Sequence, residues 1–176
     1  MVASNRWKMS DSARHGTALI GPNAILQTIP VLDQLLGQDG CGRLLERAGI
    51  IKIPDGKSMI PEHLAANLHR QLRQDAPQLS RQAAERAGLA TANYILANRI
   101  PKPAQTVLRL LPAGLSAKVL SRAIHRHAWT FVGSGRFDVV DPWCFEIHNN
   151  PLIRGEKHPA CLCHWHTAVF ARLFHV

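Results

Sequence analysis

Seven small residues are concentrated in the stretch Gln82-Ala-Ala-Glu-Arg-Ala-Gly-Leu-Ala-Thr-Ala92, which lies within a run of helical character from about residue 78 to residue 98. Small side chains allow the backbone of another element to approach closely. We therefore expect this helix to be the most buried helix of the protein. The segment Ile100-Pro-Lys-Pro103 ends it, because proline disfavours helical geometry in the residue before it.

Helical spacing also marks the chain on the N-terminal side of this stretch. After Pro22 the apolar residues recur at helical intervals: Ile25, Ile29, Leu32 and Leu36. Pro30 is expected to kink this helix and Gly37 to stop it. A short helix follows over residues 42–48 with Gly49 as its cap, and Pro61 suits the first position of a further helix.

On the C-terminal side, helices over residues 104–111 and 115–127 are followed by a change of period. From Trp129 the apolar residues alternate, which predicts three antiparallel strands over residues 129–132, 137–140 and 143–148. A final helix is expected from about residue 160. The sequence therefore predicts an α+β fold in which N-terminal helices pack on a small antiparallel sheet that is closed by a C-terminal helix.

Length and composition indicate one domain. With 176 residues the chain can bury one core. We expect residues 1–20 to form a disordered arm and residues 21–176 to form the domain. There is no run of 18 apolar residues, and the four cysteines are spaced poorly for a disulfide framework, so a cytoplasmic location fits best.

The chain is strongly basic, with a net charge of +9 and an isoelectric point near 10.1. Such a charge suggests nucleic acid or an anionic membrane surface. Lys118, Arg122 and Arg126 share one helix face opposite Leu115, Val119, Leu120, Ala123 and Ile124, which is typical of a solvated face. Aromatic residues that could stack on bases do not alternate with these cations, which argues against specific nucleic-acid binding. An anionic small molecule or an acidic partner protein remains open.

The last third of the chain is rich in metal-binding residue types. The tightest part is Cys161-Leu-Cys-His-Trp-His166, so Cys161, Cys163, His164 and His166 are candidate zinc ligands. Two adjacent segments are needed to surround an ion, so Cys144 or His148 is the expected completing ligand. The C-x-C-H-x-H spacing differs from structural zinc motifs, and reactive thiols or ordinary packing are the alternatives.

Several segments resemble one family. Residues 122–137, 150–155 and 161–174, together with residues 87–103, closely resemble the 4-vinyl reductase proteins of bacteriochlorophyll biosynthesis. The resemblance implies a fold related to transport-particle subunits that hold a lipid chain, and a role in handling the C8 vinyl group of a divinyl chlorophyll precursor. It also implies a further hairpin after the last helix, so we expect the domain to be incomplete at its C-terminal end. A site of action at the periphery of photosynthetic membranes is a further expectation.

Reduction of a vinyl group needs a source of hydride or electrons. Gly133-Ser-Gly135 lacks the third glycine of a dinucleotide-binding loop, and no four-cysteine iron–sulfur spacing is present. No redox cofactor is therefore expected, and magnesium is expected only as part of a bound tetrapyrrole. We expect a carrier or accessory protein that supports C8-vinyl reduction. The alternatives are a genuine 4-vinyl reductase with an external electron donor, and a metal-binding sensor or scaffold.

A flat apolar macrocycle suits a pocket lined by aromatic residues, and the candidates are Trp129, Phe131, Trp143 and Phe145. His148 could provide an axial imidazole for magnesium, and Arg136 or Arg154 could pair with a propionate. The alternative is that these aromatic residues belong to the core. The expected partners are a Mg-porphyrin or chlorophyllide, other enzymes of the bacteriochlorophyll pathway, and a second copy of the chain.

Overall fold

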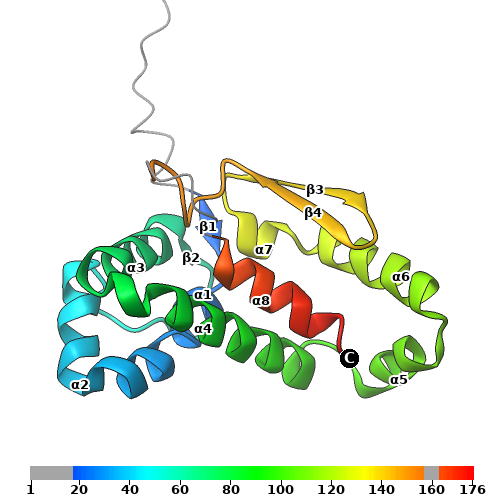
Figure 1. Ribbon diagram of the computed structural model, residues 1–176, viewed down its shortest axis with the longest axis horizontal. Helices are drawn as coiled ribbons and strands as arrows, with labels where there is room; N and C mark the ends of the chain where they lie inside the picture. The colour runs from blue at the N-terminus through cyan, green and yellow to red at the C-terminus, as the bar shows by residue number, and fades with distance from the viewer. Residues whose placement is uncertain (1–17, 157–162) are drawn as a thin grey trace, which may run out of the picture.

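A closely packed pair of helices and a two-stranded hairpin organise the computed structural model, which describes residues 18–156 and 163–176 (Figure 1). The helices are α1 (Asn23–Leu26), α2 (Ile29–Arg47), α3 (Glu62–Asp75), α4 (Pro77–Asn98), α5 (Lys102–Leu110), α6 (Ala113–Arg126), α7 (Trp129–Val132) and α8 (His164–Leu173). The strands are β1 (Leu19–Ile20), β2 (Ile60–Pro61), β3 (Arg136–Asp141) and β4 (Cys144–His148). The predicted α+β class with a C-terminal helix is confirmed. None of the helices in the described part is long and apolar enough to span a bilayer.

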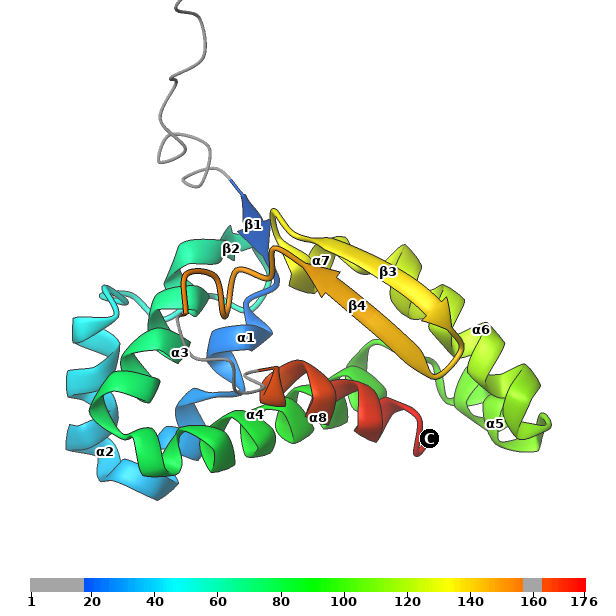
Figure 2. The ribbon, with the colours of Figure 1, turned by 45° about the horizontal axis from the view of Figure 1, so that its top comes forward.

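Helices α4 and α8 lie side by side in the middle of the molecule (Figures 1 and 2). The predicted close approach occurs at Gly88. A Cβ atom added there would collide with the backbone carbonyl of Trp165 and would lie 2.8 Å from the Cβ of Ala168. The residues of α4 that are buried are Ala83, Ala84, Ala87, Gly88, Thr91, Ala92 and Leu96. The small residues of α4 thus allow α8 to pack directly against the α4 backbone.

Glycines and prolines shape α2 largely as the sequence predicts. Gly37 has φ 72° and ψ 165°, so it breaks the helix into two parts. Gly49 has φ 78°, its N–H donates to the Glu46 carbonyl, and the Ile50 N–H donates to the Leu45 carbonyl, which is a Schellman cap. The prediction for Pro30 was wrong: it occupies the first turn of α2, where its missing N–H needs no partner, and it does not kink the helix.

The predicted three-stranded meander is wrong in its first strand. Residues 129–132 form the short helix α7, although their composition favours a strand. The N–H groups of Thr130 and Phe131 donate to the carbonyls of His127 and Ala128, so α7 continues the backbone pairing that ends α6. The carbonyl of Thr130 accepts from Gly21, next to β1. Tertiary context therefore overrides propensity here.

Two antiparallel pairs replace the expected meander. β3 and β4 form a hairpin in which Phe137 is opposite Ile147 and Val139 is opposite Phe145. β1 pairs with β2 and begins within the expected arm: Leu19 and Ile20 form this strand, and Ile20 is fully buried. The part of the arm before residue 18 lies outside the described residues.

The exposed face of α6 also differs from the prediction. Leu115 and Val119, expected on the buried side, are exposed beside Lys118 and Arg122. The residues of α6 that are buried are Ala117, Leu120, Ser121 and Ile124. On α5 no residue is buried. These two helices therefore present apolar and cationic side chains to the surface together.

Replacement of Gly88 by alanine tests the close packing of α4 and α8. We expect a loss of about 2 kcal/mol of unfolding free energy or more, because the new methyl group must displace the Trp165 backbone and overpacking costs roughly 1–3 kcal/mol. Urea unfolding measures this loss. Gly42→Ala is the matched control, since no atom lies within 4 Å of its added Cβ and alanine favours a helix by about 1 kcal/mol. Equal stability of Gly88→Ala and the wild type would contradict the packing described here.

Candidate functional site

The β3–β4 hairpin carries several of the predicted site residues on its outer, solvent-facing side. Cross-strand pairing places Arg136 opposite His148 and Asp138 opposite Glu146. The His148 Nε2 atom lies 3.1 Å from Asp138 Oδ2 and 3.2 Å from Glu146 Oε2, and Arg136 lies 2.8 Å from the same Asp138 oxygen. His148 and Arg136 are therefore engaged with carboxylates on an exposed face.

The aromatic residues of the predicted pocket do not share one environment: two pack on a core phenylalanine and two are exposed. Phe131 and Phe145 pack edge-on against Phe170, with ring centroids 5.5 and 5.2 Å away, and so belong to the core, as the alternative interpretation holds. Trp129 and Trp143 are 59% and 61% exposed. Trp143 packs against Phe174 near the end of α8, with ring centroids 5.2 Å apart.

Arg154 is held by a buried carboxylate. Its guanidinium lies 3.3 Å from Glu62 Oε1 and donates to the Ser134 hydroxyl at 2.7 Å and to the Asn149 carbonyl at 2.6 Å. Glu62, which is fully buried, also accepts from the Ser134 N–H and hydroxyl, both at 2.7 Å. Gly133 has φ 54°, and an added Cβ there would collide with Glu62. This network joins α3 to the turn before β3, and it already occupies Arg154.

A buried polar cluster surrounds Asn150 at the N-terminal end of α8. The Asn150 Oδ1 atom accepts from the Leu152 N–H at 3.0 Å. Its Nδ2 atom lies 3.4 Å from His166 Nδ1 and 3.9 Å from Cys163 Sγ. Because the amide oxygen is engaged, Nδ2 donates to Nδ1, and this assigns the proton of neutral His166 to Nε2.

Two imidazoles in this region are kept neutral by burial. Burial lowers the pKa of His166 to about 4, and the Phe131 carbonyl acts in the opposite direction. Burial lowers the pKa of His69, on α3, to about 3, with smaller contributions from the charge of Arg73 and from His166. His69 Nε2 and Trp165 Nε1 find no hydrogen-bond partner among the described residues, and His166 Nε2 has none of normal geometry, although the Phe131 carbonyl acts on its ring. Three such nitrogens are unusual in a buried cluster.

The predicted zinc ligands are dispersed. Cys163 and His166 meet at Asn150, but His164 Nδ1 lies 3.7 Å from Glu85 Oε1, and Cys144 is exposed on the hairpin. Cys161 lies outside the described residues. Within residues 18–156 and 163–176, no three His, Cys, Asp or Glu side chains are grouped to hold a metal ion. A zinc site at α8 remains a prediction that requires Cys161.

The residues that sequence reasoning missed are His69 and Asn150. The only available signal for His69 was its place beside Leu68 and Leu72, on the apolar side of α3. A polar residue at such a position is expected to be buried, and its polar atoms then need hydrogen-bond partners among its neighbours. Asn150 was part of the segment that resembles the family, but its side-chain role depends on contacts with α8.

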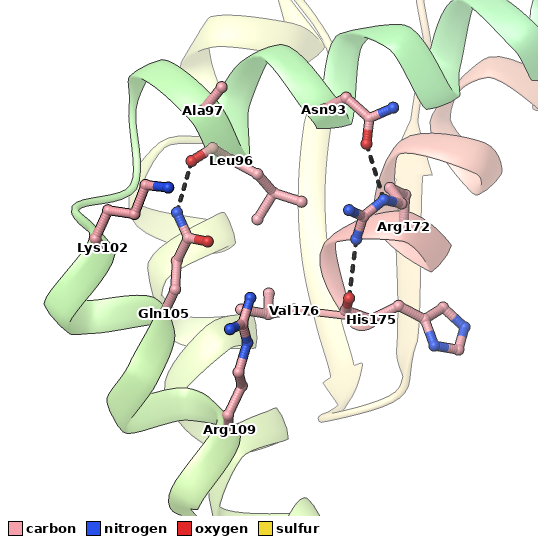
Figure 3. A pocket seen from close by; sticks show the side chains of 9 residues that line it. All are labelled: Asn93, Leu96, Ala97, Lys102, Gln105, Arg109, Arg172, His175 and Val176. Carbon is pink, nitrogen blue, oxygen red and sulfur yellow. Dashed lines mark hydrogen bonds between the residues drawn. The ribbon is translucent and has the colours of Figure 1, made fainter.

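A groove lies at the opposite, C-terminal end of α8. One hollow of about 220 Å³ is polar and is lined by Asn93, Leu96, Ala97, Lys102, Gln105, Arg109, Arg172, His175 and Val176 (Figure 3). Figure 3 shows Arg172 bound to the Asn93 side chain and the His175 carbonyl, and Gln105 bound to the Leu96 carbonyl. Lys102 and Arg109 make no ion pair or hydrogen bond with other described side chains. They are therefore available to an anion.

The second hollow, of about 240 Å³, adjoins the first and shares Arg109 and Val176 with it. Most of its lining residues are apolar by type: Leu108, Leu111, Ala113, Ala117, Leu120, Trp143, Leu173, Phe174 and Val176, with Arg109 and Ser116 as the polar members. Together the two hollows match a ligand with an apolar body and a carboxylate. Trp143 is the one member of the predicted ligand-binding set that lines this groove.

These features define an α+β protein whose surface groove is apolar at one end and cationic at the other. No protein family model and no solved structure matches the chain. Over 157 residues, covering 88% of the chain, it is 51% identical to the bacteriochlorophyll synthase 23 kDa chain of Cereibacter sphaeroides, of which 76% is covered. The protein of the same name from Rhodobacter capsulatus is 48% identical over 157 residues, with 73% covered. The chain belongs to the family of bacteriochlorophyll synthase 23 kDa chains, which places it in bacteriochlorophyll biosynthesis.

The neutral buried histidines predict a specific loss of stability in acid. Below pH 6.5 the unfolded chain binds protons at both imidazoles, whereas folded His166 and His69 stay neutral until about pH 4 and pH 3. Unfolding free energy is therefore retained above pH 6.5 and falls as the pH decreases from 6.5 to 4, by roughly 1.4 kcal/mol per pH unit for each histidine.

His69→Leu should remove about half of this slope, and it should cost little at pH 7 because it also removes an unpaired buried nitrogen. Urea unfolding between pH 4 and pH 7 measures the effect. His63→Gln, exposed on the same helix, is the control and should keep the wild-type slope. An unchanged slope in His69→Leu would show that His69 is not held neutral.

Proposed function

We propose that the protein binds a divinyl Mg-tetrapyrrole in the groove at the end of α8 and presents it for C8-vinyl reduction by other enzymes of the pathway. The observation that carries this proposal is a groove with an apolar part and two free cations in a chain 51% identical to a bacteriochlorophyll synthase chain. The resemblance to the 4-vinyl reductase proteins indicates the reaction, C8-vinyl reduction. A tetrapyrrole with a propionate has an apolar ring for one hollow and a carboxylate for the cations.

The arrangement of the groove suggests how such a ligand would lie. The ring would contact Trp143, Leu173 and Phe174 in the apolar hollow, which suits a flat aromatic surface. The propionate would reach Arg109, which borders both hollows, and Lys102 beside it. The two hollows together fall within the range of about 300–1,000 Å³ that is usual for small-molecule sites.

A carrier role is favoured over a stand-alone reductase by the surroundings of Gly133-Ser-Gly135. A dinucleotide-binding loop presents free N–H groups to a pyrophosphate at a helix N-terminus. Here the Ser134 N–H donates to the buried carboxylate of Glu62, and the turn leads into β3. The Ser134 N–H is therefore already engaged and is not available to a phosphate. The second candidate, a 4-vinyl reductase that draws on an external electron donor, uses the same groove.

Titration with Mg-protoporphyrin IX tests the groove. We expect a shifted Soret band and a dissociation constant in the micromolar range or tighter, which corresponds to about −8 kcal/mol. Arg109→Glu should weaken binding at least tenfold, because a charge reversal replaces attraction of the propionate by repulsion. Arg70→Glu, which makes the same charge change on the exposed side of α3, should bind normally. An unchanged Soret band at tens of micromolar protein, roughly the limit for weak binding, would refute the proposal.

A reduction assay separates the carrier from the reductase. We expect that the purified chain, given NADPH and a divinyl Mg-tetrapyrrole, forms no C8-ethyl product, because the glycine turn is engaged by Glu62. Product analysis by chromatography and mass spectrometry measures this. Turnover by the chain alone would replace the carrier proposal with the reductase.

A further inference from the structure

Helices α5 and α6 lie at the end of the molecule away from α2 (Figures 1 and 2). They carry apolar side chains that the described residues leave exposed. On α5, Val107 is 55% exposed and Leu110 is 79% exposed. On α6, Leu115 and Val119 are 48% and 44% exposed. Leu110 and Leu115 flank the short turn between the two helices. We refer to Val107, Leu110, Leu115 and Val119, with Lys118 and Arg122 between and after the α6 pair, as the α5–α6 surface.

The charge of this region has one sign. No Asp or Glu occurs between Glu85 and Asp138, so α5, α6 and α7 contain no acidic residue. The cations of α5 and α6 are Lys102, Arg109, Lys118, Arg122 and Arg126. On α6, Lys118 and Arg122 are exposed next to Leu115 and Val119 and not on a separate face. The exposed apolar groups are therefore surrounded by positive charge.

Exposed aliphatic side chains surrounded by cations can be compared with three kinds of surface: one that faces only water, one that binds nucleic acid and one that binds a membrane. A face that only contacts water does not need four exposed aliphatic side chains on two helices that contact each other. A nucleic-acid surface uses cations with polar or stacking aromatic groups, and the four apolar residues here are aliphatic. A bilayer with anionic headgroups matches both features, because aliphatic side chains enter the headgroup boundary while Lys and Arg pair with phosphates.

We infer that the α5–α6 surface docks the protein on an anionic lipid bilayer. The surface lies beside the groove, since Arg109 of α5 borders both hollows. Docking would therefore place the groove close to the bilayer, where apolar pigments partition. The inference goes beyond the proposed function and does not depend on it, because it rests on exposure and charge alone.

Flotation with vesicles tests the inference with the full chain. Vesicles of phosphatidylcholine alone are compared with vesicles in which about a third of the lipid is phosphatidylglycerol. We expect the wild-type protein to float with the anionic vesicles only, and to be released as salt screens the headgroups.

Two double variants separate the two features of the surface. Val107→Gln with Leu110→Gln removes apolar groups from α5, which has no buried residue, and Lys118→Glu with Arg122→Glu reverses two charges on α6. Each should reduce the vesicle-bound fraction at least tenfold. The matched controls are Ile51→Gln with Leu89→Gln and Arg43→Glu with Arg70→Glu, which make the same changes at exposed positions elsewhere and should bind as the wild type does.

Circular dichroism melting confirms that each variant is folded. Wild-type binding by either α5–α6 variant, or equal losses in the controls, would overturn the inference. Absence of vesicle binding together with capture of an acidic protein through the same residues would overturn it in favour of a protein partner. Titration with Mg-protoporphyrin IX in lipid-free buffer tests the groove separately, so failure of one proposal does not imply failure of the other.

Discussion

Helix α8 packs on α4 at Gly88, and this contact fixes where the hairpin and both ends of α8 lie. The absence of a side chain at Gly88 lets the backbone of Trp165 approach the α4 backbone. This approach fixes the distance between α8 and α4. Once α8 is placed, Phe170 and Phe174 form the floor on which the β3–β4 hairpin packs, with Phe145 against both. The buried imidazole of His166 then lies at one end of the helix and the groove at the other. A single close backbone contact thereby positions both features.

The two ends of α8 are chemically different. At the N-terminal end, Asn150 orients His166, and burial keeps the imidazoles of His166 and His69 neutral at physiological pH. Their unpaired nitrogens lower stability, since an unsatisfied buried donor costs roughly 1–3 kcal/mol. At the C-terminal end, Lys102 and Arg109 are open to solvent and the neighbouring surface is apolar. An anionic amphipathic molecule suits this second end and not the first.

The segment between Glu85 and Asp138 contains no Asp or Glu, and it includes residues of both the groove and the α5–α6 surface. It supplies the cations of both, because α5 contributes Lys102 and Arg109 to the groove while α6 contributes Lys118 and Arg122 to the surface. The positive charge of these helices attracts anionic partners from a distance, and added salt weakens this attraction.

Local spacing was enough to predict the helix over residues 78–98 and its close approach to another element, the Gly49 cap, and the β3–β4 hairpin with Phe145 and Ile147 on one face. A recognisable segment was enough to predict bacteriochlorophyll biosynthesis. Three features depend on contacts that local spacing does not reveal: residues 129–132 are helical, Leu115 and Val119 are exposed, and His69 is buried near His166. The pairing of Arg154 with Glu62, 92 residues away, is likewise a tertiary contact. Periodicity identifies apolar and polar positions, but whether a face is covered, and by which group, depends on contacts between segments distant in sequence.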